Sequence, residues 1–133
     1  MRVMLDTNIL ISMIFFPSLI TRRLAQVLST RHRIILCDYV IQELRLVTER
    51  KFPQKMGALN QFFLELPFDL VYTPGKIDPD SYPSIRDSKD YPILATAILE
   101  NIDVFLTGDK DFLVLDISSP EILNMNDFLE KYF

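Results

Sequence analysis

The chain of 133 residues contains little cysteine, histidine and glycine: one, one and three residues, respectively. A lone cysteine, Cys37, cannot form a disulfide within the chain, which favours a reducing compartment, and the expected location is the cytoplasm. One cysteine and one histidine also argue against a zinc site, which usually needs several of these residues. The single histidine, His32, lies between two arginines, which disfavours a nucleophile–histidine catalytic pair. Three glycines cannot supply a glycine-rich phosphate loop.

Long apolar runs and an excess of basic charge are also missing. No apolar stretch approaches the ~20 residues that span a membrane. A strand is predicted almost directly after Met1, so we expect neither a signal peptide nor a membrane partner. The formal net charge is −4, which argues against a protein that coats nucleic acid nonspecifically. The hydrophobic content of 49% and the length fit one globular domain over residues 1–133.

The hydrophobic pattern predicts strands that alternate with helices. Apolar runs predict strands at residues 2–5, 33–37, 69–73, 103–107 and 121–123, the last at an edge. Helical spacing predicts helices at about 9–16, 18–29, 39–51, 54–66, 90–101 and from 126 to the carboxyl end, with a loop at 74–88. Asp38 and Asn126 are predicted helix N-caps. This order indicates a mostly parallel sheet of four to five strands, covered on both faces.

Acidic residues occupy the ends of separate predicted elements. Asp6 follows the first strand, and Asp109 and Asp111 follow the strand at 103–107. Glu43 and Asp90 lie near the starts of two predicted helices. The carboxyl ends of parallel strands meet at one crevice, so we expect these side chains to converge there. Converging carboxylates repel one another unless a cation lies among them, and a hard divalent metal is the natural occupant. The pattern therefore predicts a metal-dependent phosphodiesterase, with a small ribonuclease as the preferred form.

Each acid also has a structural explanation. Asp6 can be a helix N-cap, and a helical residue such as Glu43 usually faces solvent. Either Asp87 or Asp90 is expected to cap the helix that follows them. An acid at such a helix start stays ionised more readily, because the helix dipole favours negative charge there.

The segment at 107–111 leaves two alternatives open. Asp109 and Asp111 either both reach the same crevice, or one of them turns outward and pairs with Lys110. Gly108 is predicted to permit an unusual backbone angle or a close approach directly after the strand.

Four short segments together resemble the PIN-domain family of ribonucleases, and their order and spacing cover nearly the whole chain. They are Val3-Met4-Leu5-Asp6-Thr7-Asn8-Ile9-Leu10, Tyr39-Val40-Ile41-Gln42-Glu43-Leu44, Asp90-Tyr91-Pro92-Ile93-Leu94-Ala95-Thr96-Ala97 and Leu106-Thr107-Gly108-Asp109-Lys110-Asp111-Phe112. Within this family the chain is most similar to toxin components of prokaryotic toxin–antitoxin pairs. Pro92 departs from the usual pattern but is compatible with a helix start.

The resemblance implies a PIN-like α/β/α sandwich that cleaves single-stranded RNA with Mg²⁺ or Mn²⁺. The implied catalytic and metal-binding acids are Asp6, Glu43, Asp90 and Asp109, with Asp111 as an accessory or alternative fourth acid. Thr7, Asn8 and Thr107 are implied to orient these carboxylates. One or two ions fit this set, with Glu43 either binding the second ion or orienting water. A protein antitoxin and a homodimer are the implied partners.

Two other functions fit part of the pattern. A non-catalytic module that binds RNA or protein would keep the fold without using the acids. A receiver-like phosphoacceptor domain would need a strand-end lysine, and the helical positions of Glu43 and Asp90 disfavour it. Basic residues that are candidates for holding an RNA backbone are Arg22, Arg23, Arg45, Arg50 and Lys51.

Overall fold

The computed structural model describes all residues, 1–133. Five parallel strands form the central sheet in the order β3-β2-β1-β4-β5. The strands are β1 (Arg2–Leu5), β2 (Arg33–Cys37), β3 (Asp69–Val71), β4 (Val104–Leu106) and β5 (Glu121–Leu123). The predicted parallel sheet is confirmed, and its two edges are the short strands β3 and β5.

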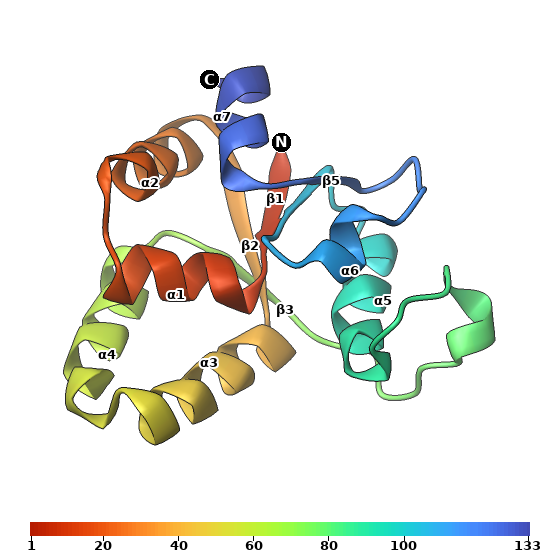
Figure 1. Cartoon of the computed structure of the whole chain (residues 1–133), viewed down its shortest axis with the longest axis horizontal. Coiled ribbons are helices and arrows are strands. Elements are labelled where there is room, and N and C mark those ends of the chain that lie inside the picture. Colours follow the sequence, from red (N-terminus) through yellow and green to blue (C-terminus); the bar gives the residue numbers. More distant parts are fainter.

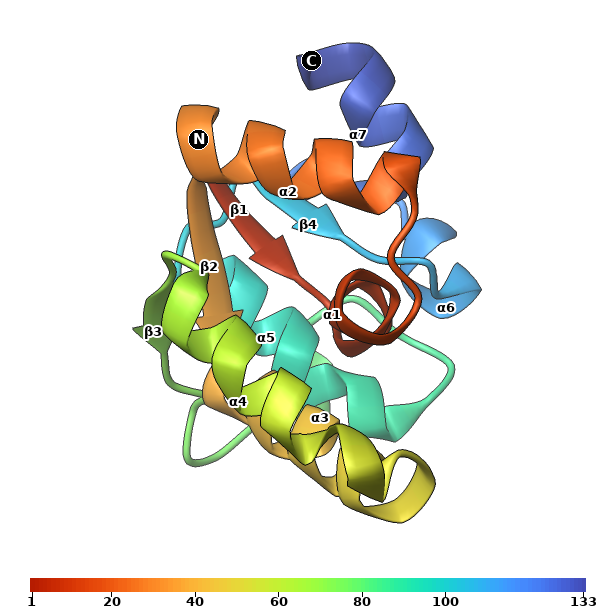
Figure 2. The ribbon, with the colours of Figure 1, turned by 90° about the vertical axis from the view of Figure 1, so that its left-hand side faces the viewer.

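Helices cover both faces of this sheet. They are α1 (Thr7–Phe15), α2 (Leu19–Arg31), α3 (Asp38–Lys51), α4 (Met56–Glu65), α5 (Tyr91–Leu99), α6 (Lys110–Leu113) and α7 (Met125–Tyr132), with 3₁₀ turns η1 (Pro53–Lys55), η2 (Pro79–Ser81) and η3 (Ser88–Asp90). Figure 1 shows α1 to α4 on one side of the sheet and α5 and α6 on the other. In Figure 2, α1 to α4 face the viewer, and both termini lie near the α2–α7 end. The α/β/α sandwich is confirmed.

No single helix is long and apolar enough to cross a membrane, although α1 and α2 pass the same test of length and composition as a pair, bent by 116°.

The three central strands supply the middle of the core. Every residue of Val3–Leu5, Ile34–Cys37 and Val104–Leu106 is buried. These strands are continuous apolar runs rather than alternating ones, because helices cover both faces of a parallel sheet. Side chains from the helices complete a cluster of 28 buried apolar residues. Residues that follow the carboxyl ends of these strands are therefore attached to a rigid, fully buried scaffold.

The strand order places a switch point between β1 and β4. From β1 the chain moves outward to β2 and β3, and it then crosses back to β4 on the other side of β1. Ligands of open α/β sheets bind at the carboxyl ends of the strands at such a point. The register aligns Leu5 with Leu106, so Asp6 and Thr107 leave adjacent strands together.

Three local predictions were wrong. Helix α3 begins at Asp38 itself, because Cys37 has the extended backbone of an N-cap, with φ −92° and ψ 153°. Helix α7 is capped by Asn124, whose side chain accepts a hydrogen bond from the Asp127 N–H at 2.8 Å, and not by Asn126. The helix predicted at 54–66 is interrupted, since a 3₁₀ turn beginning at Pro53 precedes α4.

Candidate metal centre

Asp6 is fixed at the junction of β1 and α1. Its side chain caps α1, accepting a hydrogen bond from the Thr7 N–H at 2.8 Å on Oδ1. Oδ2 accepts a hydrogen bond from the Thr107 hydroxyl at 2.6 Å. Burial is the main cause that raises the pKa of Asp6 to about 6 despite these bonds, and the nearby charges of Glu43 and Asp109 contribute to the same rise. The Asp6 carboxylate therefore both caps α1 and lies among the other predicted acids.

Glu43 reaches the same place from α3. Helices α1 and α3 pack against each other, and the Thr7 hydroxyl donates a hydrogen bond to Oε1 of Glu43 at 2.5 Å. Leu44, the next residue, is fully buried, so Glu43 lies at the border of the helix's apolar face, half-buried. Its carboxylate is thus held by α1 and not free in solvent.

Asp90 ends η3, directly before α5. The turn is held by Asp87, whose carboxylate accepts from the Lys89 N–H at 3.0 Å, and by the Tyr39 hydroxyl, which donates to the Lys89 carbonyl at 3.2 Å. Asp90 occupies the N-cap position of α5, but its side chain makes no capping bond. Of the two predicted caps, Asp87 caps the turn η3 through its side chain, and Asp90 caps α5 by position alone. The Asp90 carboxylate is therefore not occupied by a capping bond.

One oxygen of Asp90 has no partner. Oδ2 is buried and takes no hydrogen bond. Burial raises the pKa of Asp90 to about 7, and the charges of Asp109, Asp87 and Asp6 contribute in the same direction. A buried carboxylate oxygen among other carboxylates is costly unless a proton or a cation joins it.

Asp109 and Asp111 have different surroundings. Oδ1 of Asp109 caps α6 by accepting from the Asp111 N–H at 2.9 Å, and the Asp109 N–H donates to the Thr107 hydroxyl at 3.0 Å. Asp111 pairs with Arg86, and not with Lys110 as one alternative predicted. One oxygen each from Asp90, Asp109 and Asp111 nevertheless lie within 4.8 Å of one another.

Gly108 does not adopt the predicted unusual angle, because its φ is not positive. Its N–H donates to Oδ1 of Asn8 at 3.2 Å. A Cβ added at Gly108 would lie 3.7 Å from the Asn8 side chain, an ordinary contact. Asn8 thus holds the turn between β4 and Asp109. Through this contact with the backbone, Asn8 helps to position Asp109.

The structure brings all the predicted acids together. A pocket of about 260 Å³ is lined by Asp6, Thr7, Asn8, Ile11, Glu43, Val47, Asp90 and Asp109. Asp111 lies outside this lining but near Asp90 and Asp109. The donors are carboxylate oxygens, the ligands that Mg²⁺ and Mn²⁺ prefer. The unpaired oxygen of Asp90 and the raised pKa values of Asp6 and Asp90 fit a divalent cation at this place.

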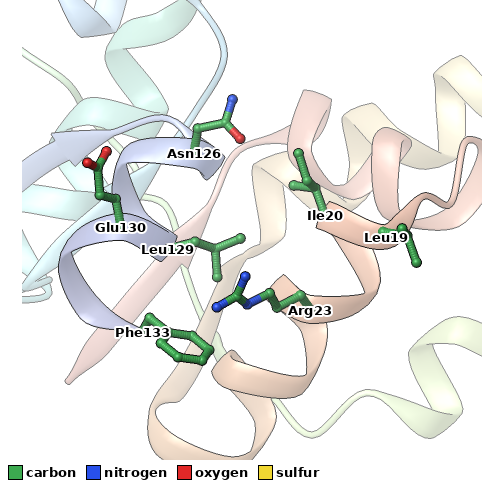
Figure 3. Close-up of a pocket in the computed structure, with 7 residues that line it drawn as sticks. All are labelled: Leu19, Ile20, Arg23, Asn126, Leu129, Glu130 and Phe133. Carbon is green, nitrogen blue, oxygen red and sulfur yellow. The ribbon is translucent and has the colours of Figure 1, made fainter.

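A larger hollow lies elsewhere, between α2 and α7, with a volume of about 540 Å³ (Figure 3). It is lined by Leu19, Ile20, Arg23, Asn126, Leu129, Glu130 and Phe133.

The Arg23 guanidinium lies over the Phe133 ring, 3.9 Å from its centroid. Arg45, another predicted RNA-binding residue, donates a hydrogen bond to Asn60. Both cations therefore contact side chains of the protein itself.

Two residues near the acids were missed from the sequence. Tyr39 holds the η3 turn, and Arg86 pairs with Asp111. Arg86 lies in the loop predicted at 74–88, where no periodic pattern indicates which side chains face the site. Only the preceding residue, Ile85, offers a signal, since an isolated apolar residue in a polar loop often anchors it; Ile85 is indeed buried.

The chain belongs to the PIN-domain family, because the sequence pattern of the PIN domain matches residues 2–111. That range includes Asp6, Glu43, Asp90, Asp109 and Asp111. A sequence comparison with curated proteins finds no match.

Solved structures with a similar fold include VapBC2 from Rickettsia felis bound to a DNA fragment from their promoter, with a TM-score of 0.73 and 21% identity over 93% of this chain and 98% of that one. DNA-bound VapBC from Salmonella typhimurium gives a TM-score of 0.69 and 17% identity over 94% and 98%. The PIN domain of human SMG5 gives 0.55 and 18% over the full length of both chains. At such identities the likeness concerns the fold.

Proposed function

We propose that this chain is an endoribonuclease that cleaves single-stranded RNA with Mg²⁺ or Mn²⁺. The observation that carries the proposal is the unpaired, buried oxygen of Asp90 among carboxylates at the switch point of the sheet. Membership of the PIN-domain family supports the same reading, since nucleases are typical of that family. A binding module would gain nothing from gathering mutually repelling acids.

Asp6, Asp90 and Asp109 are the proposed ligands of one ion, and Glu43 either binds a second ion or orients the attacking water. A divalent ion bound there would lower the pKa of a water molecule bound to it toward neutrality. It would also neutralise negative charge that develops on the phosphoryl oxygens. The chain's own groups set up this chemistry. The hydroxyls of Thr107 and Thr7 fix the carboxylates of Asp6 and Glu43, respectively, so their orientation does not depend on the ion.

The direct test is cleavage of fluorescent single-stranded RNAs of mixed sequence with Mg²⁺, with Mn²⁺ and with EDTA. We expect metal-dependent cutting by the wild type and none by Asp6→Asn, which keeps the size and shape of the side chain. Asp116→Asn, an exposed acid, is the matched control and is expected to cut like the wild type. Folded wild-type protein that binds RNA but cuts none with either metal would favour the non-catalytic binding module.

We further propose that the chain is the toxin of a toxin–antitoxin pair, with a protein antitoxin as partner and a homodimer as its own assembly. The likeness of the fold to the two VapBC structures supports the protein antitoxin as partner. The homodimer is proposed from the resemblance to toxin components of this family alone. A toxin should arrest growth of a bacterial host when expressed alone, and Asp6→Asn should not. Growth unaffected by an expressed, RNA-cutting wild type would argue for an RNA-processing role instead.

A further inference from the structure

Arg86 is an exposed cation held beside the acid cluster, which consists of Asp6, Glu43, Asp90 and Asp109 together with Asp111. Its Nε donates to Oδ1 of Asp111 at 2.8 Å, and its Nη2 lies 2.8 Å from Oδ2. This is the two-pronged arrangement in which a guanidinium matches a carboxylate. The side chain of Arg86 is 77% exposed, whereas that of Asp111 is 17% exposed.

The backbone on both sides of Arg86 is anchored. Ile85 is buried in the core, and its N–H donates to the Tyr91 hydroxyl at 3.3 Å. Asp87 caps η3 through the Lys89 N–H. The arginine thus projects from a fixed point of the 74–88 loop. An exposed ion pair contributes little to stability, so folding alone gives weak reason for this arrangement.

The pairing separates the roles of the two acids after β4. Both oxygens of Asp111 are bonded to the guanidinium. Asp109 uses only Oδ1, as the cap of α6, which leaves Oδ2 for a cation. Asp109 also lines the pocket with Asp6 and Asp90, whereas Asp111 does not. The geometry therefore suits Asp109 to a metal and Asp111 to the arginine.

We propose that Arg86, positioned by Asp111, contacts the phosphate backbone of the single-stranded RNA bound at the acid cluster. This assignment rests on the proposed nuclease function and adds a substrate-binding residue to it. Carboxylates repel a polyanion, so a backbone that approaches them needs a cation alongside. A guanidinium has five N–H donors, and the bond to Asp111 uses one edge of it. The remaining donors face solvent and match phosphate geometry.

The assignment predicts a defined change in RNA binding, measured by fluorescence anisotropy of labelled single-stranded RNAs with Ca²⁺ replacing Mg²⁺. Arg86→Ala should weaken binding about tenfold, as expected for the loss of a charge-assisted hydrogen bond. The loss should be equal for all sequences. The slope of log K against log salt is negative, and its magnitude should decrease by about 0.7, the value for one phosphate contact on a single strand. Arg86→Lys should keep that slope, because it keeps the charge.

Arg33→Ala is the matched control. Arg33 is also an exposed arginine, 72% exposed, and lies 3.5 Å from an aspartate, Asp69. It lies at the amino end of β2, whereas the acids lie at the carboxyl ends of the strands. Its removal should leave RNA affinity and salt slope unchanged, which separates a local contact from a general loss of positive charge.

A second measurement, calorimetric titration of the protein with Mn²⁺, tests the role given to Asp111. Asp109→Asn should weaken Mn²⁺ binding at least tenfold, whereas Asp111→Asn should keep it within about twofold. Equal losses in both variants would make Asp111 a metal ligand and overturn its role as the partner of Arg86. Unchanged RNA affinity and salt slope in Arg86→Ala, with a wild type that binds and cuts RNA, would overturn the arginine assignment alone. A wild type that neither binds nor cuts RNA would overturn the nuclease proposal and this assignment with it.

Discussion

The hydroxyl of Thr107 donates a hydrogen bond to Asp6 at 2.6 Å, between residues 101 positions apart in the chain. The pairing of Leu5 with Leu106 in the sheet brings the two together. The same hydroxyl accepts a hydrogen bond from the Asp109 N–H at 3.0 Å. One buried side chain therefore sets the orientation of one proposed metal ligand and the backbone of another.

Replacing Thr107 by valine, which keeps the shape and removes the hydroxyl, should weaken Mn²⁺ binding about tenfold, in the range found when groups behind metal ligands are removed. Asp6 would lose its donor, and the backbone N–H of Asp109 would lose its acceptor. Calorimetric titration with Mn²⁺ measures the change. Thr107→Ser retains the hydroxyl and should bind Mn²⁺ nearly as well as the wild type. Equal affinities for valine and serine would show that the hydroxyl has no part in metal binding.

Glu43→Gln should reduce the rate of RNA cleavage by about 10²-fold, the loss expected when a group that supports a metal ion or positions the attacking water is removed. Glutamine can still accept the hydrogen bond from Thr7, so folding and RNA affinity should change little. Measuring kcat and KM separately distinguishes these effects. Glu49→Gln, an exposed residue on the same helix, serves as the control. A wild-type kcat in Glu43→Gln would remove Glu43 from the catalytic group.

The central strands and the positions of the acids could be predicted because both depend on simple patterns. Buried strands covered on both faces are continuous apolar runs, as at Val104–Leu106. Carboxylates that follow such strands converge by the geometry of a parallel sheet. Asp6 and Asp109 were placed correctly on that basis.

Side-chain pairing across the chain could not be predicted. Asp38 was expected to cap a helix, but its carboxylate accepts hydrogen bonds from the N–H and hydroxyl of Thr73 and so joins the ends of β2 and β3. The strand predicted through Thr73 ends at Val71. Arg86 and Asp111 are 25 positions apart, and no local pattern encodes their contact. Such pairs depend on the course of loops, which sequence spacing does not determine.

Asp90 should make the metal-free protein less stable as pH rises. Its pKa is about 7 in the folded protein against an ordinary value of 3.8, so between these values the folded state holds a proton that the unfolded state has released. The stabilisation from that proton is complete below the ordinary pKa and is lost as pH rises through the folded value. In EDTA, the wild type should lose melting temperature relative to Asp90→Asn between about pH 5 and about pH 8. Parallel melting profiles of the two proteins would contradict a raised pKa at Asp90.

A divalent metal should reverse this trend. An ion that binds only the folded protein stabilises it by about 2.7 kcal/mol when its concentration is a hundredfold above Kd. At about pH 8, where Asp6 and Asp90 are ionised, Mn²⁺ should therefore raise the melting temperature of the wild type by about 10 °C. At about pH 5 the rise should be smaller, because protons compete for both carboxylates. Thermal unfolding followed by circular dichroism, with NaCl at equal ionic strength as the control, measures the effect. A rise of the same size in Asp90→Asn would place the bound ion outside this cluster, since that variant lacks the one carboxylate that has a buried oxygen without a protein partner.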